Sequence, residues 1–310
     1  MGMGLKIFYQ MKPLIPRRLQ IAMRRIRARI KLRTHGNVWP IDEKAATRPE
    51  NWKGWPDGKQ FAFVLTHDID TAKGQDRCRQ LIELELGLGF TASYNFVPEG
   101  YPVREELNNY LTENGFEVGV HGLNHDGKYF HSFHIFQERA KKINRYLKEW
   151  ESVGFRCPSM LHNLDWMHGL DIKYDSSTFD TDPFEPQSEG VGTIYPFWVP
   201  SGNGSEGYIE IPYTLPQDFT LFIILKHKTI DIWKRKLDWI VSKGGMALML
   251  THSDYINFNG TNLSEEEYSY RYYEEFLSYV KTQYRGQYWQ ALPREVARFC
   301  KPIFERNNTE

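Results

Sequence analysis

The sequence predicts an α/β protein, built as a parallel β/α barrel or a related open sheet over residues 60–304. Two observations predict this fold class. Apolar, strand-like runs alternate with helical patterns along this region, which is the order of a parallel sheet covered by helices. In addition, polar residues come directly after strand-like runs, where barrel enzymes place their chemistry. The chain has 310 residues and is 41% hydrophobic, which is enough for a proper core in one large domain or two modest ones.

The N-terminal region, residues 1–35, predicts a basic amphipathic helix. Residues 1–33 contain ten Lys or Arg residues and no acidic residue, so that the rest of this chain of zero net charge carries ten negative charges. From Pro16 onward, apolar residues recur every three or four positions. They are Ile15, Leu19, Ala22, Ile26 and Ile30. This spacing predicts an apolar stripe bordered by arginines.

Such a helix has two interpretations, between which the sequence does not choose. Through residues 12–33 it can lie on an anionic membrane surface or meet a lipid-linked substrate there, and each basic residue then contributes about 1 kcal/mol. Alternatively, the helix docks on its own domain or on a second subunit. Nucleic acid is not expected as a partner, because no recognisable binding module accompanies the basic charge.

The elements of the domain follow in alternation. Residues 36–59, rich in Pro, Gly, Trp and polar residues, predict a linker that wraps onto the domain. Strands are expected at 61–65, 90–97, 116–120, 154–158, 172–177 and 246–250. Helices are expected at 75–86, 103–114, 133–152, 230–242 and 264–284, the last of which closes the domain. Residues 183–219, heavy in Pro, Gly and aromatic residues, predict an irregular insertion with a hairpin around 202–207.

Cysteine usage and hydropathy bear on the cellular compartment. Cys78, Cys157 and Cys300 are few, odd in number and widely spaced, which indicates a reducing compartment without a disulfide framework. The longest uninterrupted apolar runs, such as residues 221–225, are far too short to span a bilayer, and no signal-peptide pattern precedes the fold. We therefore expect a cytoplasmic protein.

Two short motifs after strand-like runs predict a hydrolytic metal centre. Asp68 and Asp70 follow the strand that begins at residue 61, and His121 and His125 follow the strand 116–120. Each motif alone is weak, because paired histidines are often surface or core residues and paired aspartates often cap helices or form turns. Together they offer two nitrogens and a carboxylate oxygen, a ligand set for a divalent metal that keeps a position open for water. Zinc is the expected ion, and cobalt, manganese or nickel can serve the same set.

Taken in order, five motifs resemble the polysaccharide deacetylases of the NodB homology type, also called carbohydrate esterase family 4, over roughly residues 60–255. The motifs are Asp68-Ile69-Asp70, His121-x-x-x-His125, Arg156-x-Pro158, Tyr174-Asp175-Ser176-Ser177 and Leu250-Thr251-His252. The resemblance implies a distorted (β/α) barrel with fewer than eight regular strands. It also implies metal-dependent removal of an acyl group, usually N-acetyl, from an amino sugar.

The resemblance implies a role for each matching residue. Asp68 matches the general base, Arg156 the arginine that pairs with this base, and His252 the general acid. The implied metal ligands are Asp70, His121 and His125. The implied substrate-binding residues are Asp175, Pro158 and Tyr174.

Several positions depart from the usual family pattern, among them Ser253, which intervenes between His252 and Asp254 where an adjacent Asp is frequent. Ile69 separates the two aspartates, a variant that resembles a branch containing small cyclic amide hydrolases as well as sugar deacetylases. Gly122 stands where Ser or Thr is common, so that one supporting hydrogen bond is expected to be missing. His67 replaces a more usual aromatic residue, and we interpret it as a packed ring rather than as a group that supports the site.

We therefore expect a metal-dependent hydrolase that removes an N-acetyl or other N-acyl group from an amino sugar of a cell-envelope or capsule glycan or its precursor. Its partner is a carbohydrate substrate. The alternatives are a cyclic amide or ureide hydrolase of the same fold, an O-acetyl esterase, and an inactive glycan-binding module. The complete set of base, metal ligands and acid argues against the inactive module.

Overall fold

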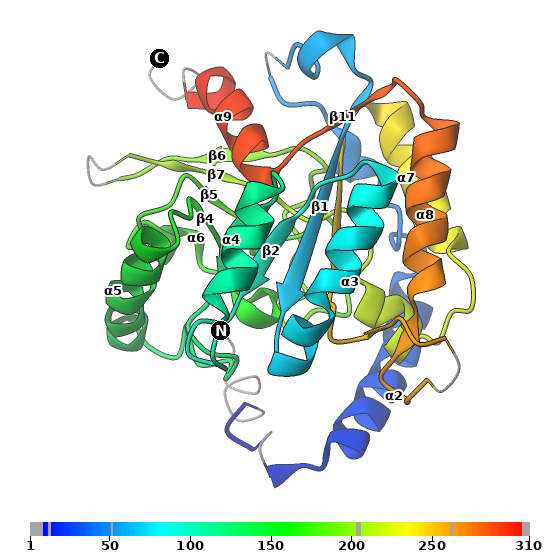
Figure 1. Cartoon of the computed structure of the whole chain (residues 1–310). Coiled ribbons are helices and arrows are strands. Elements are labelled where there is room, and N and C mark those ends of the chain that lie inside the picture. Colours follow the sequence, from blue (N-terminus) through cyan, green and yellow to red (C-terminus); the bar gives the residue numbers. More distant parts are fainter. Residues whose placement is uncertain (1–8, 12–13, 51, 203–205, 261–262, 306–310) are drawn as a thin grey trace.

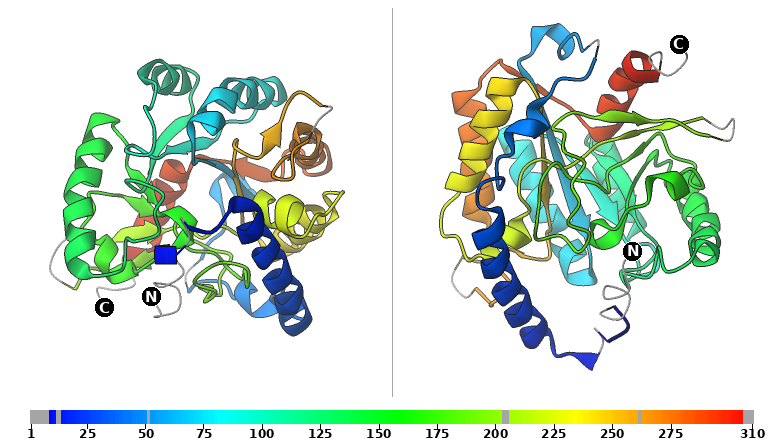
Figure 2. Two further views of the ribbon diagram at one scale, coloured as in Figure 1. Left: turned by 90° about the horizontal axis from the view of Figure 1, so that it is seen from below. Right: turned by 180° about the vertical axis from the view of Figure 1, so that it is seen from behind.

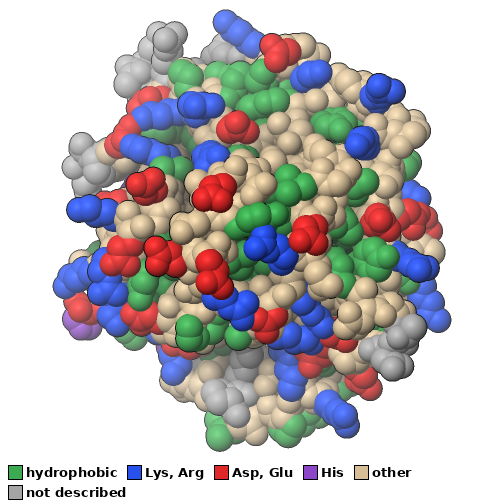
Figure 3. Space-filling view, in the orientation of Figure 1, with side chains coloured by type: hydrophobic (Ala, Val, Ile, Leu, Met, Phe, Trp, Pro, Cys, Tyr) green, Lys and Arg blue, Asp and Glu red, His purple; other side chains and the backbone are tan. Residues whose placement is uncertain are grey.

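The computed structural model describes residues 9–11, 14–50, 52–202, 206–260 and 263–305. Within them, a curled and mostly parallel sheet forms a half-barrel with helices around it (Figure 1, Figure 2). The predicted distorted (β/α) barrel is thereby confirmed. Charged side chains of both signs are interspersed over the face seen in Figure 3.

The main sheet contains nine strands in the described part of the chain. They are β1 (Phe61–Ile69), β2 (Ser93–Phe96), β3 (Glu117–His121), β4 (Gly154–Arg156), β5 (Tyr174–Asp175), β6 (Phe197–Val199), β7 (Tyr208–Glu210), β8 (Met246–Thr251) and β11 (Tyr288–Gln290). The order is β11-β1-β2-β3-β4-β5-β7-β6, and β8 also pairs with β1. Only β6 and β7 pair antiparallel, and they form the hairpin predicted around 202–207. Its residues 203–205 lie outside the described residues.

Strand β1 is the centre of the sheet. All nine of its residues are buried, because β8 pairs along one edge, β2 and β11 pair along the other, and both faces are covered. The sequence of a strand that is buried on both faces is a continuous apolar run rather than an alternation of apolar and polar residues. The polar residues at its carboxyl end are therefore held in a fully packed setting.

Irregular backbone, rather than a complete strand, closes the barrel between β7 and β8. The backbone N–H of Tyr213 donates to the carbonyl of Thr178 at 3.0 Å, and that of Leu215 donates to the carbonyl of Leu248 at 3.0 Å. Only isolated bridges occur along this segment. The barrel is distorted because one side of it lacks regular strands.

Helices cover the outside of the curled sheet (Figure 2). The predicted helices are present with small shifts at their ends. They are α3 (Ala72–Leu88), α4 (Glu105–Glu113), α5 (Phe133–Glu149), α7 (Asp231–Lys243) and α8 (Tyr270–Gln283). A short helix, α6 (Leu164–Met167), and a C-terminal helix, α9 (Pro293–Phe304), complete the set.

The helix predicted at 264–284 needs correction in two respects, and one further element was not predicted. The helix predicted at 264–284 begins only at Tyr270, because β10 (Tyr268–Ser269) first pairs with β9 (Ile256–Asn257) in a separate two-stranded sheet. Helix α8 does not close the domain, since β11 and α9 follow it and β11 pairs with β1. The segment that follows the predicted insertion forms a buried π-helix, η5 (Phe219–Ile224).

The segment 36–59 packs onto the domain with two short 3₁₀ turns, η2 (Glu43–Ala46) and η3 (Pro56–Gly58). The indole Nε1 of Trp55 donates to the carbonyl of Gly244 at 2.9 Å. The carbonyl of Ala45 accepts from the N–H of Ile194 at 3.0 Å.

Helix α2 (Arg17–His35) lies near the carboxyl end of the strands and contacts η5 (Figure 1, Figure 2). Its predicted apolar stripe does not face the domain, since Leu19, Ile26 and Ile30 are exposed. Ile21 and Ala28 are buried instead. They lie on the face from which Arg25 donates to the carbonyl of Ile223 in η5. Residues 1–8 and 12–13 of the predicted N-terminal region lie outside the described residues. Among the helices described, none combines the length and the apolar character needed to cross a membrane.

Candidate active site and metal centre

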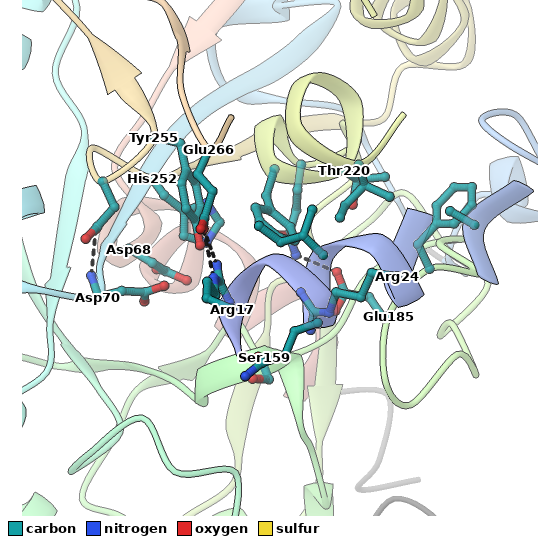
Figure 4. A pocket seen from close by; sticks show the side chains of 18 of the residues that line it. Arg17, Arg24, Asp68, Asp70, Ser159, Glu185, Thr220, His252, Tyr255 and Glu266 are labelled. Atoms are coloured by element: carbon teal, nitrogen blue, oxygen red, sulfur yellow. Dashed lines mark hydrogen bonds and ion pairs between the residues drawn. The ribbon is translucent and has the colours of Figure 1, made fainter. Parts of the chain in front are cut away.

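A pocket of about 1290 Å³ lies at the carboxyl ends of the strands, between them and α2. In Figure 4, Asp68 and Asp70 lie at one end of the pocket, whereas Arg24 and Glu185 lie at the other. Five of the predicted site residues line it, namely Asp68, Asp70, His121, His125 and His252. The fold therefore brings together in one cavity side chains that follow β1, β3 and β8.

The end of β1 delivers both aspartates. Successive side chains in a strand point to opposite faces, so Asp68 faces the pocket and His67 faces away from it. Asp70 follows directly after the last residue of the strand. Asp254 fixes this position, since its carboxylate accepts from the Asp70 N–H at 3.0 Å and from Thr71 Oγ1 at 2.5 Å.

Asp70, His121 and His125 form a compact cluster whose ligand atoms lie within 4.8 Å of one another. Asp70 Oδ1 lies 3.4 Å from His121 Nε2 and 3.5 Å from His125 Nε2. His121 Nδ1 lies 3.1 Å from the carbonyl oxygen of Arg156. This contact favours a proton on Nδ1, which leaves the lone pair of Nε2 directed at the cluster.

The chemistry of this cluster fits a divalent metal ion. Asp70 Oδ1 is buried, and no hydrogen-bond partner accompanies it in the described part of the chain. Burial alone would raise the pKa of Asp70, but the neighbouring His125 and His121 hold it well below its usual range. One carboxylate with two imidazoles is a three-ligand set that leaves a coordination position open. The residues present therefore suit a catalytic ion rather than a closed structural one.

Gly122 follows the first histidine in the left-handed region, with a φ of 64°. A Cβ at this position would lie 2.5 Å from Pro158 Cδ and 2.5 Å from the Tyr129 hydroxyl. A Ser or Thr therefore cannot fit without displacing its neighbours. The Tyr129 hydroxyl instead accepts from the N–H of Asn124 at 3.0 Å and supports the turn that leads to His125.

Asp68 is held by donors from β2 and β4. Asn95 Nδ2 donates to Asp68 Oδ1 at 2.9 Å, and Arg156 Nη1 donates to the same oxygen at 3.1 Å. Arg156 is itself fixed by Thr66 Oγ1 at 2.9 Å and by the carbonyl of Ser176 at 2.7 Å. Although burial raises the pKa of Asp68, His121 and Arg156 hold it below its usual range. Asp68 is therefore an ionised and oriented carboxylate beside the metal cluster.

His252, at the end of β8, is paired with a carboxylate. Its Nδ1 lies 2.8 Å from Asp218 Oδ1, and its backbone N–H donates to Asp218 Oδ2 at 2.9 Å. The hydroxyl of Tyr268 also donates to Asp218 Oδ2 at 2.9 Å. Burial lowers the pKa of His252, but Asp218, Asp70 and Asp68 raise it to about 10. An imidazolium at this position can donate a proton at neutral pH.

Three predicted substrate-binding residues do not line the pocket among the residues described, and they are Asp175, Pro158 and Tyr174. The hydroxyl of Tyr174 donates to Glu117 Oε1 at 2.8 Å, inside the sheet. Asp175 is fully buried and accepts from Ser177 Oγ at 2.6 Å, and burial raises its pKa to about 6. Pro158 packs beside Gly122. The expected direct contact with substrate finds no support here, because β5 is used to position Arg156 through Ser176.

His67 is fully buried and faces away from the pocket. Its Nδ1 lies 2.7 Å from Thr251 Oγ1, and its Nε2 lies 2.7 Å from Glu85 Oε1. The tyrosines 94 and 273 donate to the same glutamate. This arrangement agrees with the interpretation of His67 as a packed ring.

The sequence analysis missed two residues that hold the predicted catalytic groups. Asn95 stands opposite Asp68 in the register of β1 and β2, and a polar residue inside an apolar strand is a signal that could have identified it. Asp218 gave no such signal, because it lies between an irregular segment and the π-helix η5. Only the folded chain brings Asp218 to His252.

The far side of the pocket is formed by α2, η5 and a loop that carries Glu185. Arg17 forms an ion pair with Glu266 at 2.8 Å, and the guanidinium of Arg24 lies 5.3 Å from the centre of the Phe219 ring. Burial raises the pKa of Glu185 to about 8. This side therefore presents cationic, aromatic and neutral polar groups.

Comparisons with known proteins show which solved structures share this fold. No protein-family model matches the sequence, and no curated protein matches it. A Mycobacterium smegmatis protein assigned as a polysaccharide deacetylase shares the fold with a TM-score of 0.64 and 16% identity, over 82% of this chain and 95% of that chain. A second protein assigned as a polysaccharide deacetylase, from Pseudomonas aeruginosa PAO1, has a TM-score of 0.59 and 16% identity, over 85% of this chain and 98% of that chain. Puue allantoinase has a TM-score of 0.62 and 15% identity, also over 85% of this chain and 98% of that chain. The chain therefore has the NodB-type fold of the polysaccharide deacetylases.

Proposed function

We propose that this protein is a metal-dependent hydrolase that removes an N-acetyl or other N-acyl group from an amino sugar. The observation that carries the proposal is the contrast between two aspartates in one pocket. Asp70 faces two imidazoles with a buried oxygen to which no donor in the described part of the chain bonds, and this suits a metal ligand. Asp68 is held ionised by Arg156, which suits a general base. The shared fold supports the same conclusion.

Asp70, His121 and His125 would hold the metal. When bound, a divalent ion lowers the pKa of water toward about 7 and polarises the acyl carbonyl. We propose zinc, and cobalt, manganese or nickel can occupy the same ligands. The neutral imidazoles and the anionic carboxylate leave this centre with a net positive charge, which suits a reaction that develops negative charge on oxygen.

Two further residues of the site, Asp68 and His252, accept and donate protons in the reaction. Asp68 accepts the proton of the attacking water, while Arg156 and Asn95 keep its carboxylate ionised and oriented. His252, protonated at neutral pH, donates a proton to the departing amine nitrogen. Asp218 holds His252 Nδ1 and leaves its Nε2 for the substrate. Base and acid are thus separate residues with opposite charges, and together they supply the proton acceptor and the proton donor that amide hydrolysis uses.

The pocket supports a substrate larger than a single acyl group. Its volume of about 1290 Å³ exceeds that of typical pockets for small molecules, which reach about 1,000 Å³. Aromatic side chains that line it, such as Phe219 and Tyr255, can contact sugar rings. We propose an amino sugar of a cell-envelope or capsule glycan or its precursor. The three cysteines are free and buried, which suits the reducing cytoplasm as the location.

A second candidate function is hydrolysis of a cyclic amide or ureide. The fold is also that of Puue allantoinase, and the spacing of Asp68 and Asp70 around Ile69 resembles the branch that includes such enzymes. The same base, metal site and acid could open a cyclic amide.

Metal analysis combined with a substrate panel tests the proposal. The purified protein is analysed for metal and then incubated with N-acetyl amino sugars in free, nucleotide-linked and lipid-linked forms, and with allantoin as a cyclic ureide. About one metal ion per chain and acetate release from a sugar would support the proposal. Ring opening of allantoin without acetate release would favour the second candidate. Absence of metal after reconstitution would overturn both.

A further inference from the structure

Helix α2 has an inner face that is fixed to the domain. Ile21 and Ala28 are buried on this face. Arg25 Nε donates to the carbonyl of Ile223 in η5 at 3.1 Å, and Arg17 pairs with Glu266. Ile21, Arg24 and Ala28 also line the pocket. The helix is therefore held in one orientation. Arg18, Met23 and Arg27 also line the pocket, at the borders of the opposite face, whereas Leu19, Ile26 and Ile30 on that face do not.

The outer face of α2 carries an exposed apolar stripe formed by Leu19, Met23, Ile26 and Ile30. These side chains are 51%, 47%, 59% and 58% exposed, and their spacing of four, three and four residues places them in one row. Among the described residues, six of the nine large hydrophobic side chains that are exposed lie between positions 11 and 30. Such a concentration of apolar surface marks an interaction site rather than scattered surface residues.

Arginines border the stripe on both sides. At 3.6 residues per turn, Arg18, Arg29 and Arg33 lie along one edge, and Arg27 lies along the other. All four are exposed, and none of them forms an ion pair within the part of the chain that the structure describes. The helix itself contains no acidic residue. This differs from the face in Figure 3, where both signs of charge are interspersed.

We propose that the outer face of α2 lies on an anionic lipid bilayer, with the helix axis in the plane of the surface. The apolar stripe then enters the boundary between headgroups and acyl chains. The arginines stay among the headgroups and lay their apolar stems along the lipid. Since Arg24 and Ile21 of the same helix line the pocket, this arrangement places the pocket beside the membrane surface.

The charge pattern favours a lipid surface over a second copy of this chain. If two α2 helices packed stripe against stripe, their rows of arginines would meet, and neither helix has an acidic residue to pair with them. Anionic headgroups complement the arginines on both sides of the stripe at once. An anionic bilayer is therefore the partner whose chemistry matches both the apolar row and its border.

Vesicle flotation tests the proposal. The purified protein is mixed with vesicles of phosphatidylcholine alone or of phosphatidylcholine with phosphatidylglycerol. We expect binding to the anionic vesicles and its loss at high salt. The combined variant Leu19→Ser, Met23→Ser, Ile26→Ser and Ile30→Ser should bind at least about tenfold more weakly, because each of these side chains loses its burial in lipid. Leu86→Ser, which alters an exposed apolar residue on α3, should bind like the unaltered protein.

A dye attached to the helix reports its position even if the combined variant does not fold. All three native cysteines are buried, so Ile26→Cys introduces an exposed thiol that can carry a polarity-sensitive fluorophore. Anionic vesicles should shift the emission of this dye to the blue. The same dye on Leu86→Cys should not respond, because α3 carries this residue at its far end from the pocket (Figure 1).

Three results would overturn the proposal. The protein could fail to float with anionic vesicles, or both dyes could respond equally. The third is a dimer that forms without vesicle binding and that dissociates in the combined variant, which would assign the stripe to a second copy of the chain. None of these experiments measures hydrolysis, so their failure is distinguishable from failure of the proposed enzymatic function.

Discussion

The two walls of the pocket are built in different ways. The strand-end wall, which consists of Asp68, Asp70, His121 and His252, follows buried strands. Its residues are fixed by partners from neighbouring elements, as Arg156 fixes Asp68. The helical wall consists of α2 and η5. One of the contacts that attach α2, the ion pair between Arg17 and Glu266, is partly exposed.

We interpret this difference as a division of roles, in which the strand-end wall carries the catalytic groups and the helical wall contacts the substrate. A buried charge that loses its partner costs about 3–5 kcal/mol, so the strand-end wall cannot change without a large penalty. An exposed ion pair contributes about 0–1 kcal/mol, so a contact that α2 makes at the surface can be exchanged at low cost. Catalytic groups are expected where geometry is fixed, whereas contacts to substrate and membrane are expected where it is adaptable. The predictions below therefore start with the strand-end wall and end with α2.

The largest effects are expected from the two aspartates, and they should differ. Asp70→Ala should lose the metal and all measurable hydrolysis, because one of three ligands is removed. Asp68→Asn should keep the metal and lower kcat by about 10²–10⁴-fold, since only the base is lost. Metal content and kcat are measured on the same samples. Release of metal from Asp68→Asn would show that the roles of the two aspartates are exchanged.

The next largest effect is expected at Asp218. Asp218→Asn removes the anion that contributes most to raising the pKa of His252 to about 10. The proton donor is the imidazolium, so the alkaline limb of the kcat profile should move to lower pH. At neutral pH, kcat should fall by about tenfold or more, which is part of the 10²–10⁴-fold that acid–base catalysis supplies. An alkaline limb that stays in place would show that His252 is not the titrating acid.

The same substitution should change stability with a defined sign. A pKa that is raised in the folded state stabilises the fold fully below the unfolded value of about 6.5, and this stabilisation is lost as pH rises through about 10. The difference in unfolding free energy between the unaltered protein and Asp218→Asn should therefore shrink between pH 7 and 10. Urea unfolding at several pH values measures this difference.

A smaller effect is expected at Gly122, next to a metal ligand. Gly122→Ala should destabilise the fold by about 1–3 kcal/mol, because its φ is positive and its Cβ would meet Pro158 and Tyr129. Gly87→Ala is the matched control. Gly87 lies within α3 and has no atom near its Cβ position, so alanine there should stabilise by about 0.5–1 kcal/mol. Equal effects of the two substitutions would contradict this account of Gly122.

The sequence predicts the strand-end wall far better than the helical wall, and the reason is physical. Asp68, Asp70, His121 and His252 stand directly after continuous apolar runs, and the carboxyl ends of parallel strands meet at one edge of the sheet. The sequence pattern around each of these four residues is therefore enough to predict that they lie together. Asp175 follows the same rule only in part, since β5 has two residues and both are buried without lining the pocket.

The helical wall depends on tertiary contacts that leave no local signal. The apolar stripe of α2 was recognised, but periodicity does not say which face of a helix meets the domain. Ile21 and Ala28 are buried because η5 lies beside them, and η5 is a π-helix that no periodic pattern predicts. Asp218 reaches His252 for the same reason. The part of the site that was missed is the part built from irregular backbone.

The smallest effect is expected at Arg17, and it tests the helical wall. The side chains of Arg17 and Glu266 are 42% and 29% exposed, so their ion pair is well hydrated. Arg17→Gln should therefore lower the unfolding free energy by less than about 1 kcal/mol and leave kcat within about twofold of that of the unaltered protein. Urea unfolding and kcat on a water-soluble substrate measure the two quantities. A loss of several kcal/mol would mean that α2 is held as firmly as the strand-end wall. The contrast between a fixed catalytic wall and an adaptable helical wall would then be wrong.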